Sequence, residues 1–482
     1  MISDFTNKVF SGIFWKFSER ILAQLISFVV SLVIARILSP ADYGLVAMAM
    51  IFINIANVFV SGGFNAALIQ KKTSDEVDFS TLFYCSLLIS FVLYVILYFV
   101  SPFISRFYCN EGLTNVLRVF GLILPLSSYK SIQNAWVSKH LEFKKFFFAT
   151  LGGTIVSAVI GILMAVNGFG VWALVAQYFT NAVIDSLVLT VTISWHPKFL
   201  FSISSVRTLL PYGIKILSTD LIGVIYNQLN SFFIAKKFTS ADLAFYTKGR
   251  QIPDLIDNNI GVAISSTLFP AFSLKKDNCS DMASMCRRAV QVSCFVLLPF
   301  YFGLSVVAEN LIDVVLTSKW SPCVPFIRIV CLSCVFNSIG IIDIQLLKAI
   351  GKAGVVFKIE FIKKPLYLII LIFSLRYDIY ILACTVPVTS FIATVVNGIC
   401  VQKYVGYTLF QKLEDFFYSF LIAFIMGIAV YLLGFIHLKS IFLLFLQIFT
   451  GAIFYILLSF FSKNKSFCYI LDFWQERKRN LR

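Results

Sequence analysis

The sequence predicts an all-α integral membrane protein of about fourteen transmembrane helices, and two observations lead to this fold class. Hydrophobic residues make up 59 % of the 482-residue chain and charged residues only 13 %, against roughly 25 % in ordinary soluble domains. Apolar runs also recur along the whole length, for example at 21–35, 87–100 and 441–460. With its flanks, each run reaches the roughly 20 residues that a helix needs to cross about 30 Å of hydrocarbon.

The apolar runs define fourteen expected helices. They lie near residues 13–37, 43–67, 80–105, 114–138, 145–167, 170–193, 208–234, 242–270, 288–316, 324–349, 355–374, 378–402, 415–435 and 438–461. Three lysines, Lys358, Lys363 and Lys364, interrupt the apolar run of the eleventh helix.

Basic residues are unevenly distributed between alternate loops. One set of loops carries pairs such as Lys71–Lys72 and Lys144–Lys145, whereas the other set carries few. Since cytoplasmic loops are enriched in Lys and Arg, both termini are expected in the cytoplasm. The net charge of +16 is then explained by topology and not by binding to nucleic acid. The basic tail, 462–482, is expected to lie on an anionic membrane surface.

An internal repeat relates two parts of the chain. Residues 35–44 (ARILSPADYG) match residues 235–244 (AKKFTSADLA), so six helices pair with the next six. Six is an even number, so both halves have the same orientation, and a substrate is expected to bind between them. We expect one six-helix lobe over 1–200, a second over 201–403, and two additional transmembrane helices over 404–461.

Polar side chains form single stripes on otherwise apolar helices, at the spacing of three or four residues that places them on one face. The stripe residues are Lys16, Arg20, Gln24, Asn54, Asn57, Lys215, Tyr226, Asn230, Arg250, Asp254 and Asp257. Because charges in hydrocarbon usually face a bundle interior or water, the stripes are expected to line a hydrated chamber. The alternatives are snorkelling of Lys16 and Arg20 to the headgroups and an i,i+4 ion pair between Arg250 and Asp254.

Two isolated carboxylates, Asp185 and Asp343, lie within apolar helices. With Asp254 and Asp257 they are candidates for coupling transport to an ion, the alternative being protonated, hydrogen-bonded side chains.

The sequence has no nucleotide-binding motif and no Ser/His/Asp cluster, and its three histidines lie near segment ends without partner ligands. Cys331 and Cys334 form a CxxC pair, but it lies within a membrane segment, so we expect small hydrophobic side chains there and not a redox or metal site. We therefore expect no enzymatic activity and no cofactor, and transport driven by an ion gradient, the membrane potential or the substrate's own gradient.

Several motifs resemble those of a known family. They are RILSPADYG at 36–44, GGFNAALIQ at 62–70, and Tyr246-Thr-Lys248 followed by LFPAFS at 268–273. Their order resembles that of bacterial polysaccharide flippases of the multidrug/oligosaccharidyl-lipid/polysaccharide exporter superfamily, over nearly the whole chain.

This resemblance implies alternating access and a substrate made of an oligosaccharide repeat unit on undecaprenyl pyrophosphate. The O-antigen, capsule or exopolysaccharide unit would cross the bacterial inner membrane, in a monomer that can meet a polysaccharide polymerase and a chain-length regulator. Carried onto this chain, the cationic chamber of the family implies pyrophosphate binding by Lys16, Arg20, Lys215, Lys248 and Arg250. Many relatives have Arg where Lys248 stands, and Lys lacks the fork that binds phosphate at two points. The sugar-facing candidates are Gln24, Asn54, Asn57, Tyr226 and Asn230.

Two other functions compete with this interpretation. A multidrug or cation antiporter of the same superfamily would have a chamber dominated by carboxylates, whereas the stripes here mix cations with carboxylates. A membrane polysaccharide polymerase would need a large periplasmic loop with catalytic Arg or His residues, and no expected outer loop is long enough.

Overall fold

The computed structural model describes residues 2–61, 63–71, 74–275, 278–436, 438–462, 464 and 466–469. These residues form α-helices and one short 3-10 helix, with no strand among them, which confirms the all-α fold class. The helices before the expected second half are α1 (Ile2–Ile37), α2 (Pro40–Ser61), α3 (Phe64–Gln70), α4 (Glu76–Tyr108), α5 (Gly112–Gly121), α6 (Ile123–His140), α7 (Phe143–Val166) and α8 (Val171–Thr192). The others are α9 (Ile203–Lys237), α10 (Ser240–Leu274), α11 (Cys279–Val315), η1 (Ser318–Cys323), α12 (Val324–Ala349), α13 (Ala353–Ser374), α14 (Ile379–Val405), α15 (Leu409–Leu433) and α16 (Ser440–Phe461).

Each of the fourteen expected ranges is helical. Two of them are divided, because α2 and α3 share the range 43–67, and α5 and α6 share the range 114–138. Eleven helical segments of the described residues are long and apolar enough to cross a membrane. The ranges outside these eleven are those of α5 with α6, α10 and α13. Polar and charged side chains interrupt the apolar sequence of all three, and a break at Leu122 also divides the first into α5 and α6.

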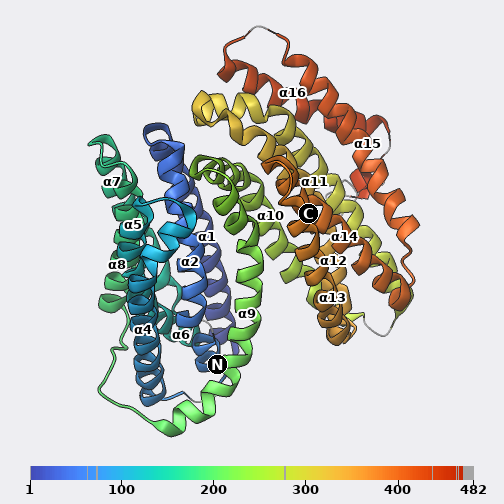
Figure 1. The fold of residues 1–482 in the computed structure, drawn as a ribbon. Coiled ribbons are helices and arrows are strands. Elements are labelled where there is room, and N and C mark those ends of the chain that lie inside the picture. The colour runs from blue at the N-terminus through green and yellow to red at the C-terminus, as the bar shows by residue number, and fades with distance from the viewer. Residues whose placement is uncertain are drawn as a thin grey trace. The chain divides into compact units, whose positions relative to one another are not determined.

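The helices divide into two compact units, unit 1 (Met1–Ala244) and unit 2 (Phe245–Arg482). In unit 1, α7 packs between α1 and α8, α4 packs on α5 and α6, and α9 packs on α2 and α3 (Figure 1). In unit 2, α11 packs on α12, α15 and α16, while α14 packs on α12 and α13. The expected lobe boundaries near residues 200 and 403 stay a prediction.

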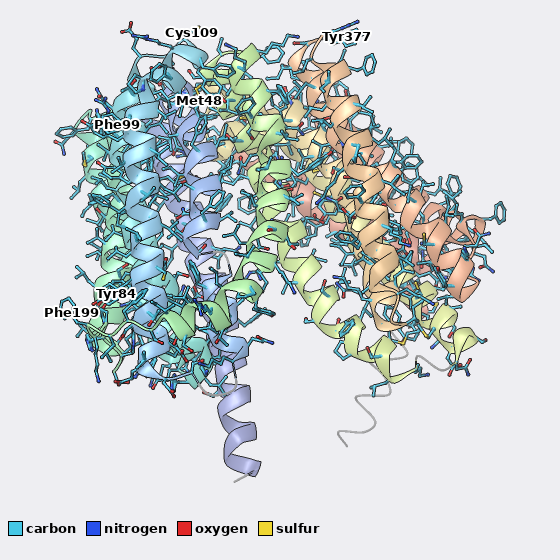
Figure 2. The ribbon with its side chains drawn as sticks, turned by 60° about the horizontal axis from the view of Figure 1, so that its bottom comes forward. Met48, Tyr84, Phe99, Cys109, Phe199 and Tyr377 are labelled. Carbon is cyan, nitrogen blue, oxygen red and sulfur yellow. The ribbon has the colours of Figure 1, made fainter. Side chains whose placement is uncertain are left out.

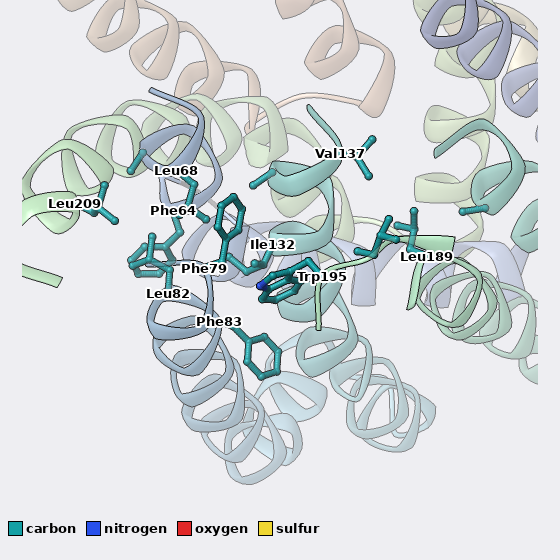
Figure 3. Close-up of a cluster of buried hydrophobic side chains, with 14 residues drawn as sticks. Phe64, Leu68, Phe79, Leu82, Phe83, Ile132, Val137, Leu189, Trp195 and Leu209 are labelled. Atoms are coloured by element: carbon teal, nitrogen blue, oxygen red, sulfur yellow. The ribbon is translucent and has the colours of Figure 1, made fainter. Parts of the chain in front are cut away.

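A cluster of buried hydrophobic side chains, several of them aromatic, joins α3, α4, α6 and α9 of unit 1 to the segment after α8 (Figure 3). Trp195, in the segment after α8, is buried against Phe79 and Phe83 of α4, with ring centroids 5.9 and 6.4 Å away. Polar contacts attach the same segment, because Lys198 forms an ion pair with Glu76 at the start of α4. The connection between α8 and α9 is therefore part of the packed body of unit 1.

The outer faces of the helices are rich in exposed apolar side chains (Figure 2). Phe99 of α4 is 68 % exposed and is labelled in Figure 2, with Tyr84 of the same helix and Cys109, which directly follows it. Such a continuous apolar surface would be costly in water. Together with the apolar helices, it makes this chain a multi-pass membrane protein.

The two elements of the sequence repeat start their helices in the same way. At the start of α2, the Ser39 hydroxyl donates a hydrogen bond to Asp42 Oδ2 at 2.6 Å, and the Asp42 amide donates to Ser39 Oγ at 3.2 Å. At the start of α10, Thr239 and Asp242 make the same two contacts at 2.7 and 3.2 Å. Side-chain oxygens at these positions satisfy backbone amides that the first turn leaves unpaired.

The two repeat elements also meet each other. A Cβ atom on Gly44 would lie 1.7 Å from the Ser240 carbonyl oxygen, so only a glycine allows the start of α2 to approach the start of α10 this closely.

A buried ion pair joins α15 to α12 in unit 2. The helix α14 ends at Gly406, in a left-handed conformation with φ of 85°. Thr408 and Gln411 then cap α15 with reciprocal hydrogen bonds of 3.1 and 3.2 Å. This turn brings Lys412 to Asp343 of α12, and the Lys412 ammonium donates to both carboxylate oxygens at 2.7 and 2.8 Å. The Lys412 and Asp343 side chains are 7 % and 0 % exposed.

We predict that Gly44→Ala lowers the thermal unfolding midpoint of the detergent-purified protein. The added methyl group would meet a backbone oxygen that cannot rotate away, and overpacking of this kind costs about 1–3 kcal/mol. Gly223→Ala in α9 is the matched control, because no atom lies within 4 Å of a Cβ atom there. Equal midpoints for the two variants would contradict the close approach of α2 and α10.

We also predict that Lys412→Met and Asp343→Leu each destabilise the protein more than the double variant does. Each single change leaves a buried charge without its partner, at a cost of about 3–5 kcal/mol, whereas removal of both charges is far less costly. Lys198→Met serves as the control, because its pair with Glu76 is exposed and contributes about 0–1 kcal/mol. The test is the thermal unfolding midpoint of the two single variants, the double variant and the control, each compared with the wild type. A double variant whose loss of stability equals the sum of the two single losses would refute the prediction.

Candidate functional site

Three of the expected phosphate-binding cations, Lys16, Arg20 and Lys215, lie in unit 1, where Lys16 interacts electrostatically with Glu19 on the same helix. Arg20 on α1 is half-buried, and Lys16 on α1 and Lys215 on α9 are exposed. None of the three forms an ion pair within the described part of the chain. Lys16 instead lies over the rings of Phe143 and Phe146 of α7, at 5.3 and 5.5 Å from their centroids. A cation–π contact leaves the ammonium charge available to an anion.

The expected sugar-facing residues also lie in unit 1. Gln24 of α1, Asn57 of α2 and Tyr226 and Asn230 of α9 are half-buried, while Asn54 is exposed. Since α2 packs on α9, the polar residues of these two helices belong to neighbouring elements. The Asn57 side-chain oxygen is buried and makes no hydrogen bond to any described residue.

Asp185, which is the single carboxylate of its helix, has a cation partner on another helix. Lys130 of α6 forms an ion pair with the buried Asp185 carboxylate of α8. Glu19 of α1 interacts electrostatically with both residues, and it accepts a hydrogen bond from Thr150 of α7. Gly153 of α7 makes room for this group, since a Cβ atom there would lie 2.0 Å from Asp185 Oδ1. Four helices of unit 1 therefore share one charged cluster.

The ion pair that the spacing allows on α10 is present. The Arg250 guanidinium donates to Asp254 Oδ2 at 2.9 Å and to the Tyr246 hydroxyl at 3.0 Å. Lys248 is buried, and its ammonium donates to Gln251 Oε1 at 3.2 Å. Gly249 lets this turn pack closely on α12, because a Cβ atom there would lie 2.6 Å from Phe326 Cβ. Both expected cations of α10 thus have partners within unit 2.

Asp257 differs from the other expected coupling residues. The hydroxyls of Tyr301 and Ser338 and the amide of Asn337 donate to its carboxylate, at 3.4, 3.3 and 3.4 Å. These donors are neutral, whereas Asp185, Asp254 and Asp343 each have a lysine or arginine partner. A half-buried carboxylate held by neutral donors can exchange a cation or proton without breaking an ion pair.

Three buried or half-buried lysines were not among the expected site residues. Lys130 pairs with Asp185, Lys363 with Glu360, and Lys412 with Asp343. In the sequence each lysine lies inside or at the edge of an apolar run. That position could have indicated a buried ion pair, because lysines in hydrocarbon are rare and usually paired.

Comparison with known proteins assigns the chain to a family. Residues 33–325 match the family described as polysaccharide biosynthesis protein. The succinoglycan biosynthesis transport protein ExoT of Rhizobium meliloti is 24 % identical over 333 residues, which cover 69 % of this chain and 67 % of that protein. The lipopolysaccharide biosynthesis protein WzxC of Escherichia coli is 22 % identical and covers 75 % and 74 %. The teichuronic acid biosynthesis protein TuaB of Bacillus subtilis is 22 % identical and covers 89 % of both chains.

Solved structures share the fold. The lipid II flippase MurJ, in an inward closed conformation, superposes with a TM-score of 0.76 at 16 % identity and covers 94 % of this chain and 99 % of that chain. An inward-facing multidrug resistance transporter of the MATE family superposes with a TM-score of 0.64 at 13 % identity, covering 80 % and 94 %. The chain is therefore a multi-pass membrane protein that belongs to the polysaccharide biosynthesis protein family, with the fold seen in MurJ and in MATE transporters.

Proposed function

We propose that this protein is a flippase that moves undecaprenyl-pyrophosphate-linked oligosaccharide repeat units across the bacterial inner membrane. Family membership carries the proposal, since the relatives are named for the transport or synthesis of succinoglycan, lipopolysaccharide and teichuronic acid. The translocated repeat unit would serve the synthesis of O-antigen, capsule or exopolysaccharide. Both termini would lie in the cytoplasm, and transport would proceed by alternating access of the lobes at 1–200 and 201–403.

The chemistry of the chain supports a phosphorylated lipid as the substrate. A pyrophosphate cannot cross hydrocarbon unaided, because burying an unpaired charge costs many kcal/mol. Lys16, Arg20 and Lys215 are cations on apolar helices, and none of them forms an ion pair within 4.0 Å among the described residues. We assign them the first contact with the pyrophosphate. Arg250 and Lys248 already have protein partners, so they would contribute through the electrostatic potential or after exchanging partners.

We predict that Arg20→Ala lowers translocation of a labelled lipid-linked oligosaccharide in proteoliposomes about tenfold or more. A hydrogen bond to a charged group contributes about 1.5–3 kcal/mol, and 1.4 kcal/mol corresponds to a factor of ten. Arg250→Ala is expected to lower transport less, because Arg250 is occupied by Asp254 and Tyr246. The control is Arg207→Ala, which removes an exposed arginine at the start of α9. Transport at the wild-type rate in both Arg20→Ala and Arg250→Ala would refute the anion site.

We further propose that transport is coupled to an ion gradient through Asp257. The Asp257→Asn variant is expected to keep substrate binding and to lose the dependence of transport on an imposed proton or sodium gradient, because the amide can neither ionise nor bind a cation strongly. Asp254→Asn is the matched comparison, since Asp254 is paired with Arg250. Transport is measured with and without each gradient, and a gradient response in Asp257→Asn equal to that of the wild type would exclude this role.

A further inference from the structure

Unit 2 contains a pocket of about 290 Å³ between α10, α12, α13 and α14, lined by both polar and apolar side chains. Its polar lining includes Asp257 of α10, Asn337 of α12, Glu360 and Lys363 of α13, and Asn397 of α14. None of these residues except Asp257 belongs to the expected site. Ligand pockets typically have volumes of about 300–1,000 Å³, so this one has room for a single small ring or a comparable group.

The pocket holds two carboxylates, Asp257 and Glu360, and one ammonium, Lys363, and these groups contact their neighbours. Lys363 is 3 % exposed, and its ammonium donates to Glu360 at 2.5 Å and to Asn397 Oδ1 at 3.3 Å. Asp257 is held by the neutral donors described above, one of which is the side-chain amide of Asn337. The lining therefore presents ammonium and amide donors beside carboxylate and amide acceptors.

These groups disfavour several classes of ligand. The described residues contain no group of three His, Cys, Asp or Glu side chains arranged to hold a metal, and the fixed positive charge of Lys363 disfavours a multivalent cation. A phosphate would meet the Asp257 and Glu360 carboxylates, which repel it. An apolar compound would make no hydrogen bond to the carboxylates and amides of the lining.

A neutral polyhydroxylated ligand satisfies all these groups. Each sugar hydroxyl can donate to a carboxylate and accept from an amide or ammonium, and the Asn side chains offer both roles within one group. We propose that this pocket is a subsite for one monosaccharide unit of the transported lipid-linked oligosaccharide. The proposal rests on the function proposed above, and it places a sugar contact in unit 2, apart from the polar stripes of unit 1.

The roles of the side chains follow from their contacts. Asn397 is a specificity-determining residue, because it is buried beside the Lys363 ammonium and its amide can bind a ring hydroxyl. Asn337 would bind a second hydroxyl while it keeps Asp257 oriented. Gly340 of α12 keeps the space open, since a Cβ atom there would lie 3.5 Å from Thr394 Oγ1 and 3.7 Å from Asn397 Nδ2.

The test compares two probes on the purified full-length protein in lipid nanodiscs. The first probe is undecaprenyl pyrophosphate carrying the repeat-unit oligosaccharide from the bacterium that makes this protein, and the second is undecaprenyl pyrophosphate without sugar. Asn397→Ala is expected to weaken binding of the sugar-bearing lipid about tenfold, as loss of a buried hydrogen bond does. Binding of the sugar-free lipid is expected to stay within about twofold of the wild type.

Two further variants make the result specific. Gly340→Ala adds a methyl group that narrows the pocket and meets its neighbours at ordinary van der Waals distances. It removes no polar group, so it should fold even where Asn397→Ala does not. It is expected to weaken binding of the sugar-bearing lipid alone. Asn310→Ala is the control, because that amide contacts Gln447 of α16 at 2.8 Å, outside the pocket. Both probes should bind this control as they bind the wild type.

Each other outcome has a definite meaning. Equal binding of the sugar-bearing lipid by the wild type, Asn397→Ala and Gly340→Ala would overturn the subsite and leave the proposed function standing. Equal weakening for both probes would show a general packing role and would also overturn the subsite. Sodium-dependent thermal stabilisation that is lost in Asn397→Ala, with no sugar effect, would identify a cation site instead. A wild type that binds and transports neither lipid would refute the proposed function itself, and with it the subsite.

Discussion

Compensation of charge inside an apolar helical body is the constraint on which this structure depends. A carboxylate or ammonium group in a low-dielectric interior loses its hydration, and a partner with good geometry is what makes it tolerable. The chain meets this constraint with pairs that cross between helices, such as Lys412 with Asp343 and Lys130 with Asp185. These pairs connect α15 to α12 and α6 to α8, so they also determine which helices pack together.

The same constraint separates structural charges from charges that can act on a ligand. Asp185, Asp254 and Asp343 each form an ion pair with a lysine or arginine of the protein, so their negative charge is already neutralised. Lys16, Arg20 and Lys215 form no ion pair within 4.0 Å among the described residues, and the hydrogen-bond donors to Asp257 are neutral. In the function proposed above, the cations of unit 1 would contact the anionic headgroup, and the pocket of unit 2 would contact a sugar.

The helices could be predicted from sequence because crossing hydrocarbon demands a long apolar run, and the fourteen expected ranges are all helical. The match between residues 35–44 and 235–244 was also visible in the sequence, and both segments begin a helix with the same side-chain contacts. Partners from distant helices were not visible: Asp343 and Lys412 are 69 residues apart, and nothing in the local pattern connects them. Lys363 interrupted an apolar run, but its place in a pocket depends on three other helices.

The pair between α12 and α15 has a consequence for synthesis of the protein. The chain emerges from the N-terminus onward, so Asp343 is made 69 residues before the lysine that neutralises it. Until then α12 carries an unpaired carboxylate, which must remain protonated or stay near water while α13 and α14 are inserted. We therefore expect α12 to reach its final position only after α15 has been inserted. In a chain truncated before Lys412, α12 would lack the partner of its buried carboxylate and would not pack stably in the bilayer.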